Sequence, residues 1–304
     1  MIIAVFPGQG SQTPGFLAPW LERPGARARV EAFSEWSGVD LIAAGTTWDA
    51  DAIRDTAVAQ PLIVAASILS WNALSDRDRI DGVAGHSVGE FAAAAASGIL
   101  SEEDALRLVG IRGRAMAQAA AAEATGMSAV IGGDEASVVA RLRQLDLTPA
   151  NYNGGGQLVA AGSLDALQAL AADPPKGTRV IALQVAGAFH TRYMAPAVDA
   201  LRAAAADVAV ADPRVAVWSN RDGARVESGA AFRESLVEQV ASPVRWDLSM
   251  SSFADAGVTG IIELAPAGTL VGLAKRALRG TPSVAVKTPD DLAAASALLQ
   301  GDPA

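Results

Sequence analysis

The sequence predicts an α/β protein in two parts, a large domain with a mostly parallel sheet and a small inserted α+β domain. Three observations predict it. Strand-like and helix-like segments alternate through most of the 304 residues, which is typical of a parallel sheet. A central segment instead follows the βαββαβ order of a ferredoxin-like unit. Hydrophobic residues make up 51% of the chain and charged residues 19%, a balance that supports a large core and excludes global disorder.

The first part of the chain supplies the opening elements of the large domain. Residues 2–6 are apolar and stop at Pro7-Gly8, as a short buried strand does. Ser101 is followed by three acidic residues, which marks a helix start because carboxylates favour the first turn. We expect a strand at 2–6, a buried helix at 57–73, a strand at 81–85, an alanine-rich helix at 91–96, and a helix from 101 through Arg112 towards Ala120.

The middle of the chain carries the small domain. We expect strands at 127–131, 150–153, 157–161 and 178–185 and helices at 135–145 and 163–172, with three glycines at 154–156 as the turn between two strands. We place the small domain at residues 125–186 and the large domain at 1–124 and 187–304. The large domain resumes near Gly187 with a helix, followed by strands at 214–219 and 258–264 and a helix at 269–278.

Composition excludes several classes of function. The chain has no cysteine, which rules out disulfides, thiolate metal sites and cysteine catalysis. Its two histidines disfavour a histidine-built metal centre. The net charge of −9 argues against nucleic-acid binding. The start lacks a basic signal-peptide region, and the longest apolar run, 61–69, is too short to span a bilayer. We expect a soluble, monomeric, cytoplasmic protein that contacts neither nucleic acid nor membrane.

The clearest chemical signal is the motif Gly85-His-Ser-Val-Gly89, which lies between a predicted strand and a predicted helix. This is the context of a nucleophile elbow, in which the serine hydroxyl is exposed on a sharp turn and glycines allow strand and helix to approach closely. Ser87 is then the nucleophile, and the backbone N–H of Val88 points to where an oxyanion would form. The alternative is a glycine-flanked turn with a chance serine.

A serine nucleophile needs a base, and the chain offers His86 and His190. His86 is adjacent to Ser87, and neighbouring side chains at a strand end point to opposite sides. We therefore expect His86 to be a packed, hydrogen-bonded residue and His190 to be the base by elimination. The alternative for His190 is a surface histidine at the domain junction.

An arginine in the helix after the elbow is a candidate for binding a carboxylate. The neighbours of Arg112 are apolar, so its guanidinium would need a partner there, and a substrate carboxylate could form a bidentate pair with it. Spacing alone does not choose among Arg107, Arg112 and Arg114.

Two glycine-rich loops do not support a nucleotide site. Gly8-Gln-Gly-Ser-Gln12 lacks the lysine of a phosphate loop, and Asn153-Gly-Gly-Gly-Gln157 lacks the G-x-G-x-x-G spacing. The first loop could instead contribute the backbone N–H of Gln9 to an oxyanion hole.

Together these residues resemble the malonyl-CoA:acyl-carrier-protein transacylase family, which includes free-standing enzymes of fatty-acid synthesis and acyltransferase domains of polyketide synthases. The resemblance runs from Val5 to about Lys287. It rests on four motifs in order: Phe6-Pro-Gly-Gln-Gly-Ser-Gln12, Gly85-His-Ser-Val-Gly-Glu90, Gly110-Ile-Arg-Gly-Arg114 and Gly187-Ala-Phe-His190.

The resemblance implies a fold, a reaction and a set of site residues. The large domain would be α/β-hydrolase-like, and a malonyl group would pass from malonyl-CoA to the phosphopantetheine thiol of holo acyl carrier protein through a Ser87 ester, with no bound cofactor. Arg112 would hold the malonyl carboxylate. The backbone carbonyl of Gln239 would orient His190, Gln60 and Asn153 would line the cleft, and Lys275 and Arg276 would lie where CoA or the carrier protein approaches.

Two further features bear on substrate and partner. Phe189 resembles the residue of malonyl-selective members, because its ring would fill the space of an α-methyl group. The C-terminal motif departs from the family in having Ala265-Pro-Ala-Gly268, which we expect to alter a loop and not the chemistry. An acidic carrier protein would need a local basic patch on this acidic chain, and the candidates are Lys275, Arg276, Arg279 and Arg192.

Other functions remain as alternatives. A serine esterase or thioesterase shares G-x-S-x-G but usually places its histidine near the chain end, whereas 114 residues follow His190 here. A catalytically silent scaffold would not need Ser87, Arg112 and His190 together. The same chemistry could also serve a polyketide synthase or a malonate decarboxylase.

Overall fold

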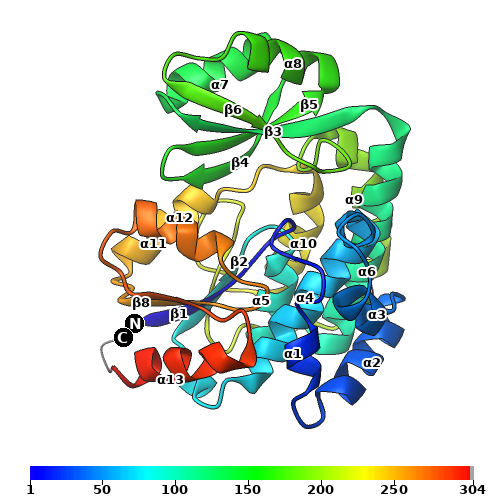
Figure 1. The fold of residues 1–304 in the computed structure, drawn as a ribbon, viewed down its shortest axis with the longest axis vertical. Coiled ribbons are helices and arrows are strands. Elements are labelled where there is room, and N and C mark those ends of the chain that lie inside the picture. Colours follow the sequence, from blue (N-terminus) through cyan, green and yellow to red (C-terminus); the bar gives the residue numbers. More distant parts are fainter. Residues whose placement is uncertain (302–304) are drawn as a thin grey trace.

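The computed structural model describes residues 1–301, which form two sheets in two layered units stacked along the long axis of the molecule (Figure 1). The large unit holds a parallel sheet covered by helices. The small unit, green in Figure 1, sits at one end and holds an antiparallel sheet. The predicted fold class is confirmed in both parts.

Within residues 1–301, the large sheet has five strands in the order β7-β2-β1-β8-β9. They are β1 (Ile2–Phe6), β2 (Gly82–Gly85), β7 (Ala216–Trp218), β8 (Gly260–Glu263) and β9 (Ser283–Ala285), and every neighbouring pair is parallel. The inner strands are short and buried because helices cover both faces. Strand β9 was not predicted, because it is a half-buried edge strand of three residues and its apolar run, residues 284–286, is very short.

Helices of the large unit pack around this sheet. They are α1 (Ala18–Leu21), α2 (Ala26–Ser37), α3 (Leu41–Thr46), α4 (Thr56–Ala73), α5 (Gly89–Ala96), α6 (Glu102–Ala122), α9 (Ala195–Ala205), α10 (Gly229–Glu238), α11 (Trp246–Asp255), α12 (Thr269–Ala277) and α13 (Leu292–Gln300). The expected helix near Gly187 was wrong in its start: α9 begins at Ala195, after a loop that carries His190.

In the described part of the chain, one helix, α4, is by length and composition apolar enough to cross a membrane, and 78% of that stretch is buried inside the protein. The core helix of a globular protein has this burial pattern, because every face of it packs against neighbours.

The small unit has the expected βαββαβ order. Its elements are β3 (Thr125–Gly132), α7 (Glu135–Gln144), β4 (Thr148–Gly154), β5 (Gln157–Ser163), α8 (Leu164–Ala172) and β6 (Thr178–Ala182). The strand order is β4-β5-β3-β6, with antiparallel pairs throughout. Strand β6 ends three residues earlier than expected, and the continuation to Val185 lines a pocket beside Ser87 instead.

The two units are joined by backbone hydrogen bonds beside β4. Tyr152 N–H donates to the carbonyl of Val244 at 2.9 Å, and Val244 N–H donates to Ala150 at 2.8 Å. These bonds hold the edge of the small sheet against the segment that precedes α11.

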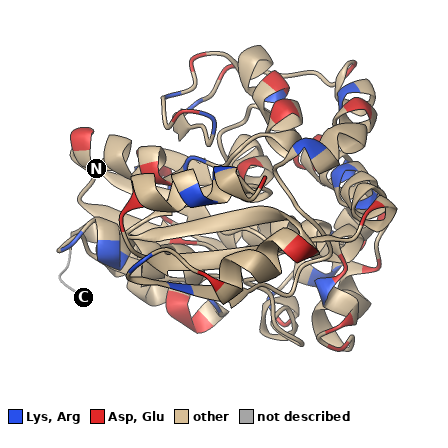
Figure 2. Cartoon of the chain, turned by 90° about the horizontal axis from the view of Figure 1, so that it is seen from above, with Lys and Arg blue, Asp and Glu red and all other residues tan. Residues whose placement is uncertain are grey.

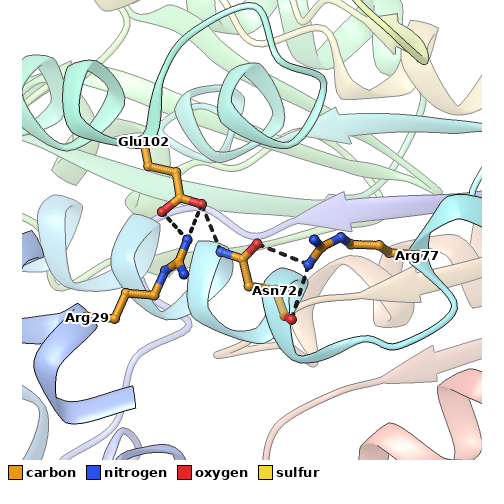
Figure 3. Close-up of polar contacts among 4 residues, drawn as sticks. All are labelled: Arg29, Asn72, Arg77 and Glu102. Carbon is orange, nitrogen blue, oxygen red and sulfur yellow. Dashed lines mark hydrogen bonds and ion pairs between the residues drawn. The ribbon is translucent and has the colours of Figure 1, made fainter. Parts of the chain in front are cut away.

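A polar network ties three helices of the large unit together (Figure 3). One terminal nitrogen of Arg29 on α2 lies 2.7 Å from both carboxylate oxygens of Glu102 at the start of α6. Asn72 on α4 donates to the same carboxylate at 2.9 Å and accepts from Arg77 at 3.2 Å. The network is partly exposed, so we expect it to contribute at most about 1 kcal/mol to the free energy of unfolding.

Candidate active site

The predicted elbow forms the sharp turn between β2 and α5. Ser87 has a φ of 52°, the left-handed conformation that non-glycine residues rarely adopt. The flanking glycines permit the turn: a Cβ at Gly85 would lie 2.0 Å from the carbonyl carbon of Gly89, and one at Gly89 would lie 2.2 Å from the carbonyl oxygen of Phe6. Glycine is therefore required at both positions so that strand and helix can approach closely, as the motif predicted.

His190 lies within hydrogen-bonding distance of Ser87. Its Nε2 is 2.8 Å from Ser87 Oγ, and its Nδ1 is 2.8 Å from the backbone carbonyl of Gln239. A carbonyl can only accept, so Nδ1 carries the proton and Nε2 is free to accept the serine proton. Burial and the charge of Arg112 lower the pKa of His190 to about 3, which keeps the ring neutral at physiological pH.

Arg112 is buried, with 1% of its surface exposed, and reaches the same point from α6. Its guanidinium donates to Gln60 Oε1 at 2.6 Å, to Gln239 Oε1 at 2.9 Å and to Ser87 Oγ at 3.3 Å. Burial lowers its pKa to about 10, so it stays charged. Among residues 1–301, no acceptor pairs with its Nε, and none of its hydrogen-bond partners is a carboxylate. A buried cation with neutral partners favours an anionic ligand.

Two glycines of α6 explain why Arg112 lies this deep. A Cβ at Gly110 would lie 2.3 Å from the Ser37 carbonyl oxygen, and one at Gly113 would lie 2.8 Å from that of Thr56. Helix α6 therefore approaches α2 and α4 closely enough to bring Arg112 to Gln60. Of the three candidate arginines, Arg107 pairs with Asp104 and Arg114 with the Ser37 carbonyl, so Arg112 alone meets Ser87.

A pocket of about 90 Å³ opens beside Ser87 and is lined from both units. From the large unit come Gln9, Gln60, His86, Ser87, Val88, Arg112, Met116, Phe189 and His190, and from the small unit and its exit come Met127, Asn151, Val159, Leu183 and Val185. The backbone N–H groups of Gln9 and Val88 have no hydrogen-bond acceptor within the described part of the chain. Both residues line the pocket, and their assignment to an oxyanion hole stays a prediction.

Asn153 does not line this pocket. It lies behind it, with Oδ1 2.9 Å from Nε2 of His86, and His86 packs edge-on against Trp246 at 5.6 Å between ring centroids. His86 is thus the packed, hydrogen-bonded residue that we expected. The pocket position belongs to Asn151, whose buried Oδ1 has no partner in residues 1–301. Asn151 was not predicted, because positions 151 and 153 share one face of a strand and alternation does not tell which of the two reaches the pocket.

The basic candidates lie away from this pocket. Lys275 and Arg276 are exposed in the last turn of α12, where Arg276 donates to Gln157 Oε1 at 3.0 Å in the small unit. Arg192 pairs with Asp146 at 2.6 Å, so its charge is already compensated. Arg279 is exposed just beyond α12.

Two residues that fix the elbow were missed as site residues. Asn220 follows β7; its Oδ1 accepts from Ser87 N–H at 2.7 Å and its Nδ2 donates to the Gly85 carbonyl at 2.7 Å. Glu90 is buried behind the elbow and accepts from the Asn220 N–H at 2.7 Å. A carboxylate in an otherwise apolar, alanine-rich helix was the available signal for Glu90. No local pattern marks Asn220.

Comparisons with known proteins agree over nearly the whole chain. The family model for the acyl transferase domain matches residues 3–293. The chain is 55% identical over 296 residues to the malonyl CoA-acyl carrier protein transacylase of Mycobacterium tuberculosis, covering 96% of this chain and 98% of that protein.

Solved structures give the same result. The crystal structure of MCAT from Mycobacterium tuberculosis aligns with a TM-score of 0.93 at 55% identity, covering 96% of this chain and 98% of that one. A malonyl-transacylase in complex with a holo type II PKS acyl-carrier protein aligns with a TM-score of 0.90 at 30% identity, covering 99% of each chain.

Proposed function

The chain belongs to the acyl transferase domain family, and from this premise we propose that it transfers a malonyl group from malonyl-CoA to the phosphopantetheine thiol of an acyl carrier protein. The observation that carries the proposal is the meeting of Ser87, His190 and the buried Arg112, a cation that has no carboxylate hydrogen-bond partner among residues 1–301. A nucleophile and base handle the acyl carbon, and the cation selects an acyl group that bears its own carboxylate.

In the first half-reaction, Ser87 Oγ attacks the thioester carbon and gives its proton to His190 Nε2. The developing oxyanion takes hydrogen bonds from the N–H groups of Gln9 and Val88, and each such donor is typically worth about 10²–10³ in rate. The C–S bond breaks, the proton passes from His190 to the CoA sulfur, and the malonyl ester remains on Ser87.

In the second half-reaction, the phosphopantetheine thiol of the carrier attacks the ester and His190 takes its proton. The tetrahedral intermediate collapses, the C–O bond to Ser87 breaks, and the proton returns to Ser87 Oγ. The Gln239 carbonyl holds His190 in one tautomer through both steps, in place of an acidic residue.

Substrate choice would rest on Arg112, Gln60 and Phe189. The guanidinium would bind the malonyl carboxylate. Gln60 holds the guanidinium in place by accepting its hydrogen bond at 2.6 Å. Phe189 lines the pocket and would exclude an α-methyl group, which is worth about 1–3 kcal/mol at most. Asn153 would act on the pocket only through His86.

The proposal extends to the cofactor, the partner and the setting. We assign no bound cofactor, because acyl transfer from a thioester needs none, and malonyl-CoA is the substrate. The acidic carrier would approach Lys275 and Arg276, and the protein would act as a cytoplasmic monomer in fatty-acid synthesis. Service to a polyketide synthase is the second candidate, favoured by the likeness to a transacylase solved with a type II PKS acyl-carrier protein.

Intact-mass spectrometry tests the proposal directly. The wild-type protein should gain the mass of one malonyl group from malonyl-CoA and lose it to holo carrier protein, and Ser87→Ala should gain nothing. An adduct lost to water without transfer would favour the hydrolase alternative. A full adduct on Ser87→Ala would remove Ser87 from the mechanism.

A further inference from the structure

Glu90 is a buried acid that the proposed mechanism does not use. It lies in the first turn of α5 with 1% of its surface exposed. One carboxylate oxygen accepts from the backbone N–H of Asn220 at 2.7 Å, and the other accepts from Gln239 Nε2. Both partners belong to the scaffold that holds Ser87.

The side chain of Gln239 links this acid to Arg112. Its Nε2 donates to Glu90 and, at 3.1 Å, to the carbonyl of Ser87, while its Oε1 accepts from Arg112 at 2.9 Å. A single amide therefore separates the carboxyl of Glu90 from the guanidinium that faces the pocket. Hydrogen bonds in such a chain polarise one another, so the charge of Glu90 is felt at Arg112.

The other charged groups around Glu90 have less influence on its ionisation than Arg112. Arg221 and Asp222, which follow β7, pair with each other at 3.5 Å and are 60% and 48% exposed. Glu238 at the end of α10 is exposed, and His190 is neutral because its pKa is about 3. Solvent screens the exposed groups, which leaves Arg112 on α6 as the buried charge that acts on Glu90.

A small cavity gives the carboxyl a place to exchange protons. It has a volume of about 30 Å³, enough for one water molecule, and is lined by Glu90, Gln239, Arg221 and Glu238 among others. It is separate from the substrate pocket, since the two cavities share none of their lining residues.

We propose that Glu90 is a specificity-determining positioning residue, whose protonated form leaves the charge of Arg112 available to the substrate carboxylate and whose ionised form neutralises Arg112 through Gln239. The inference rests on the proposed function, because it assumes that Arg112 binds an acyl carboxylate. Ionised Glu90 would place two anions around one buried cation once malonyl is bound, which is unfavourable where dielectric screening is weak.

Burial raises the pKa of Glu90 to about 8, against the opposing effects of its two hydrogen bonds and of Arg112. Malonyl binding adds a second anion and should raise this pKa further. A group whose pKa rises on binding takes up a proton, so malonyl affinity should fall as pH rises through about 8. Acetyl groups carry no carboxylate and should show no such loss.

Proton counting by calorimetry tests this on the full chain. Ser87→Ala protein is titrated with malonyl-CoA at pH 8 in two buffers of different ionisation enthalpy, and with acetyl-CoA, which has the same phosphates, as the comparison. We expect the protein to take up about half a proton per site more on binding malonyl-CoA than on binding acetyl-CoA. Adding Glu90→Gln should abolish the difference, whereas Glu238→Gln, an exposed acid bordering the same cavity, should leave it intact.

The outcomes separate the two proposals. Malonyl-CoA binding with no proton uptake beyond that of acetyl-CoA overturns the role of Glu90 and leaves the transferase function standing. Failure of malonyl-CoA to bind overturns the proposed function and the inference together. If Glu90→Gln does not fold, the comparison of malonyl-CoA with acetyl-CoA on the protein that retains Glu90 still decides the point.

Discussion

At the scale of single residues, Gln239 connects the whole site. Its backbone carbonyl orients His190, its Oε1 accepts from Arg112, and its Nε2 donates to the Ser87 carbonyl and to Glu90. The family resemblance predicted the carbonyl contact. The side-chain contacts of Gln239 were not predicted, because no sequence pattern marks an amide that joins several buried groups.

Replacing Arg112 with alanine should reduce malonyl loading far more than acetyl loading. The variant loses a buried charge pair with the acyl carboxylate, which costs about 2–5 kcal/mol and hence roughly 30-fold to several thousand-fold in kcat/KM. Acetyl loading should fall less, or rise, because no unpaired guanidinium remains to be desolvated. Single-turnover loading with each thioester measures both.

The matched control is Arg107→Ala, an exposed arginine on the same helix that pairs with Asp104. It should leave both rates unchanged. Equal losses for malonyl and acetyl groups in Arg112→Ala would contradict a role in selecting the carboxylate.

The low pKa of His190 predicts the acid side of the pH profile. The ring acts as a base in its neutral form, which predominates at pH values above its pKa of about 3. The lowered pKa therefore extends activity to lower pH. The rate constant for Ser87 loading at saturating malonyl-CoA should stay nearly flat from pH 8 to pH 5, with circular dichroism to check folding. A half-loss of rate near pH 6.5, the ordinary value for histidine, would contradict this.

At the scale of elements, helix approach at glycines positions the chemistry. β2 meets α5 at Gly85, α5 meets the end of β1 at Gly89, and α6 meets α4 at Gly113. Each contact brings a functional group from a different element to one point. The sequence marked these glycines through its motifs, but which element each one touches follows only from the packing.

Gly113→Ala should displace α6 from α4 and pull Arg112 away from Gln60. The new Cβ would lie 2.8 Å from the Thr56 carbonyl oxygen, and overpacking of this kind typically costs about 1–3 kcal/mol in unfolding free energy. Malonyl loading should fall more than acetyl loading. Thermal unfolding and single-turnover loading measure the two effects.

Gly272→Ala is the control for that substitution. Gly272 lies within α12, and a Cβ there would have no neighbouring atom within 4 Å, so the change should be neutral or stabilise the protein by about 0.5–1 kcal/mol. Unaltered stability and selectivity in Gly113→Ala would show that the close approach is not what positions Arg112.

At the scale of the whole molecule, the pocket exists only because two units meet. Its lining comes from both units, and the backbone hydrogen bonds of Val244 with Tyr152 and Ala150 hold the units together. Figure 2 shows acidic and basic residues interspersed over the helices, in keeping with a net charge of −9. An acidic carrier would therefore depend on a local cluster of positive charge.

Reversing two charges on α12, Lys275→Glu with Arg276→Glu, should raise the KM for carrier protein several-fold and most strongly at low salt, because exposed charges mainly steer association. The KM for malonyl-CoA in the loading step reports whether CoA uses the same residues. Steady-state transfer at two ionic strengths measures the effect.

The control makes the same charge change on the small unit, with Arg143→Glu and Lys176→Glu, at two positions away from α12. A similar rise in KM for both double variants would mean that net charge matters and the α12 position does not. An unchanged KM in both double variants would mean that Lys275 and Arg276 are ordinary exposed residues with no role in binding the carrier.

The sequence by itself determined the local structure and the reactive turn. Alternating apolar segments predicted the parallel sheet, the βαββαβ order predicted the small unit, and Gly85-His-Ser-Val-Gly89 predicted an elbow that the structure has at φ 52°. Period and glycine placement act over a few residues, so they can be read from a linear chain.

Only the tertiary structure decided which side chains meet. Spacing left three arginines open, and the family resemblance placed Asn153 in a pocket that Asn151 lines instead. Neither gave a sign that Gln239 would join Glu90 to Arg112. Positions 60, 87, 112, 190 and 239 lie on separate elements, and their distances depend on how helices and sheets pack. That packing is set by the shapes of surfaces far apart in the sequence, and no local pattern records it.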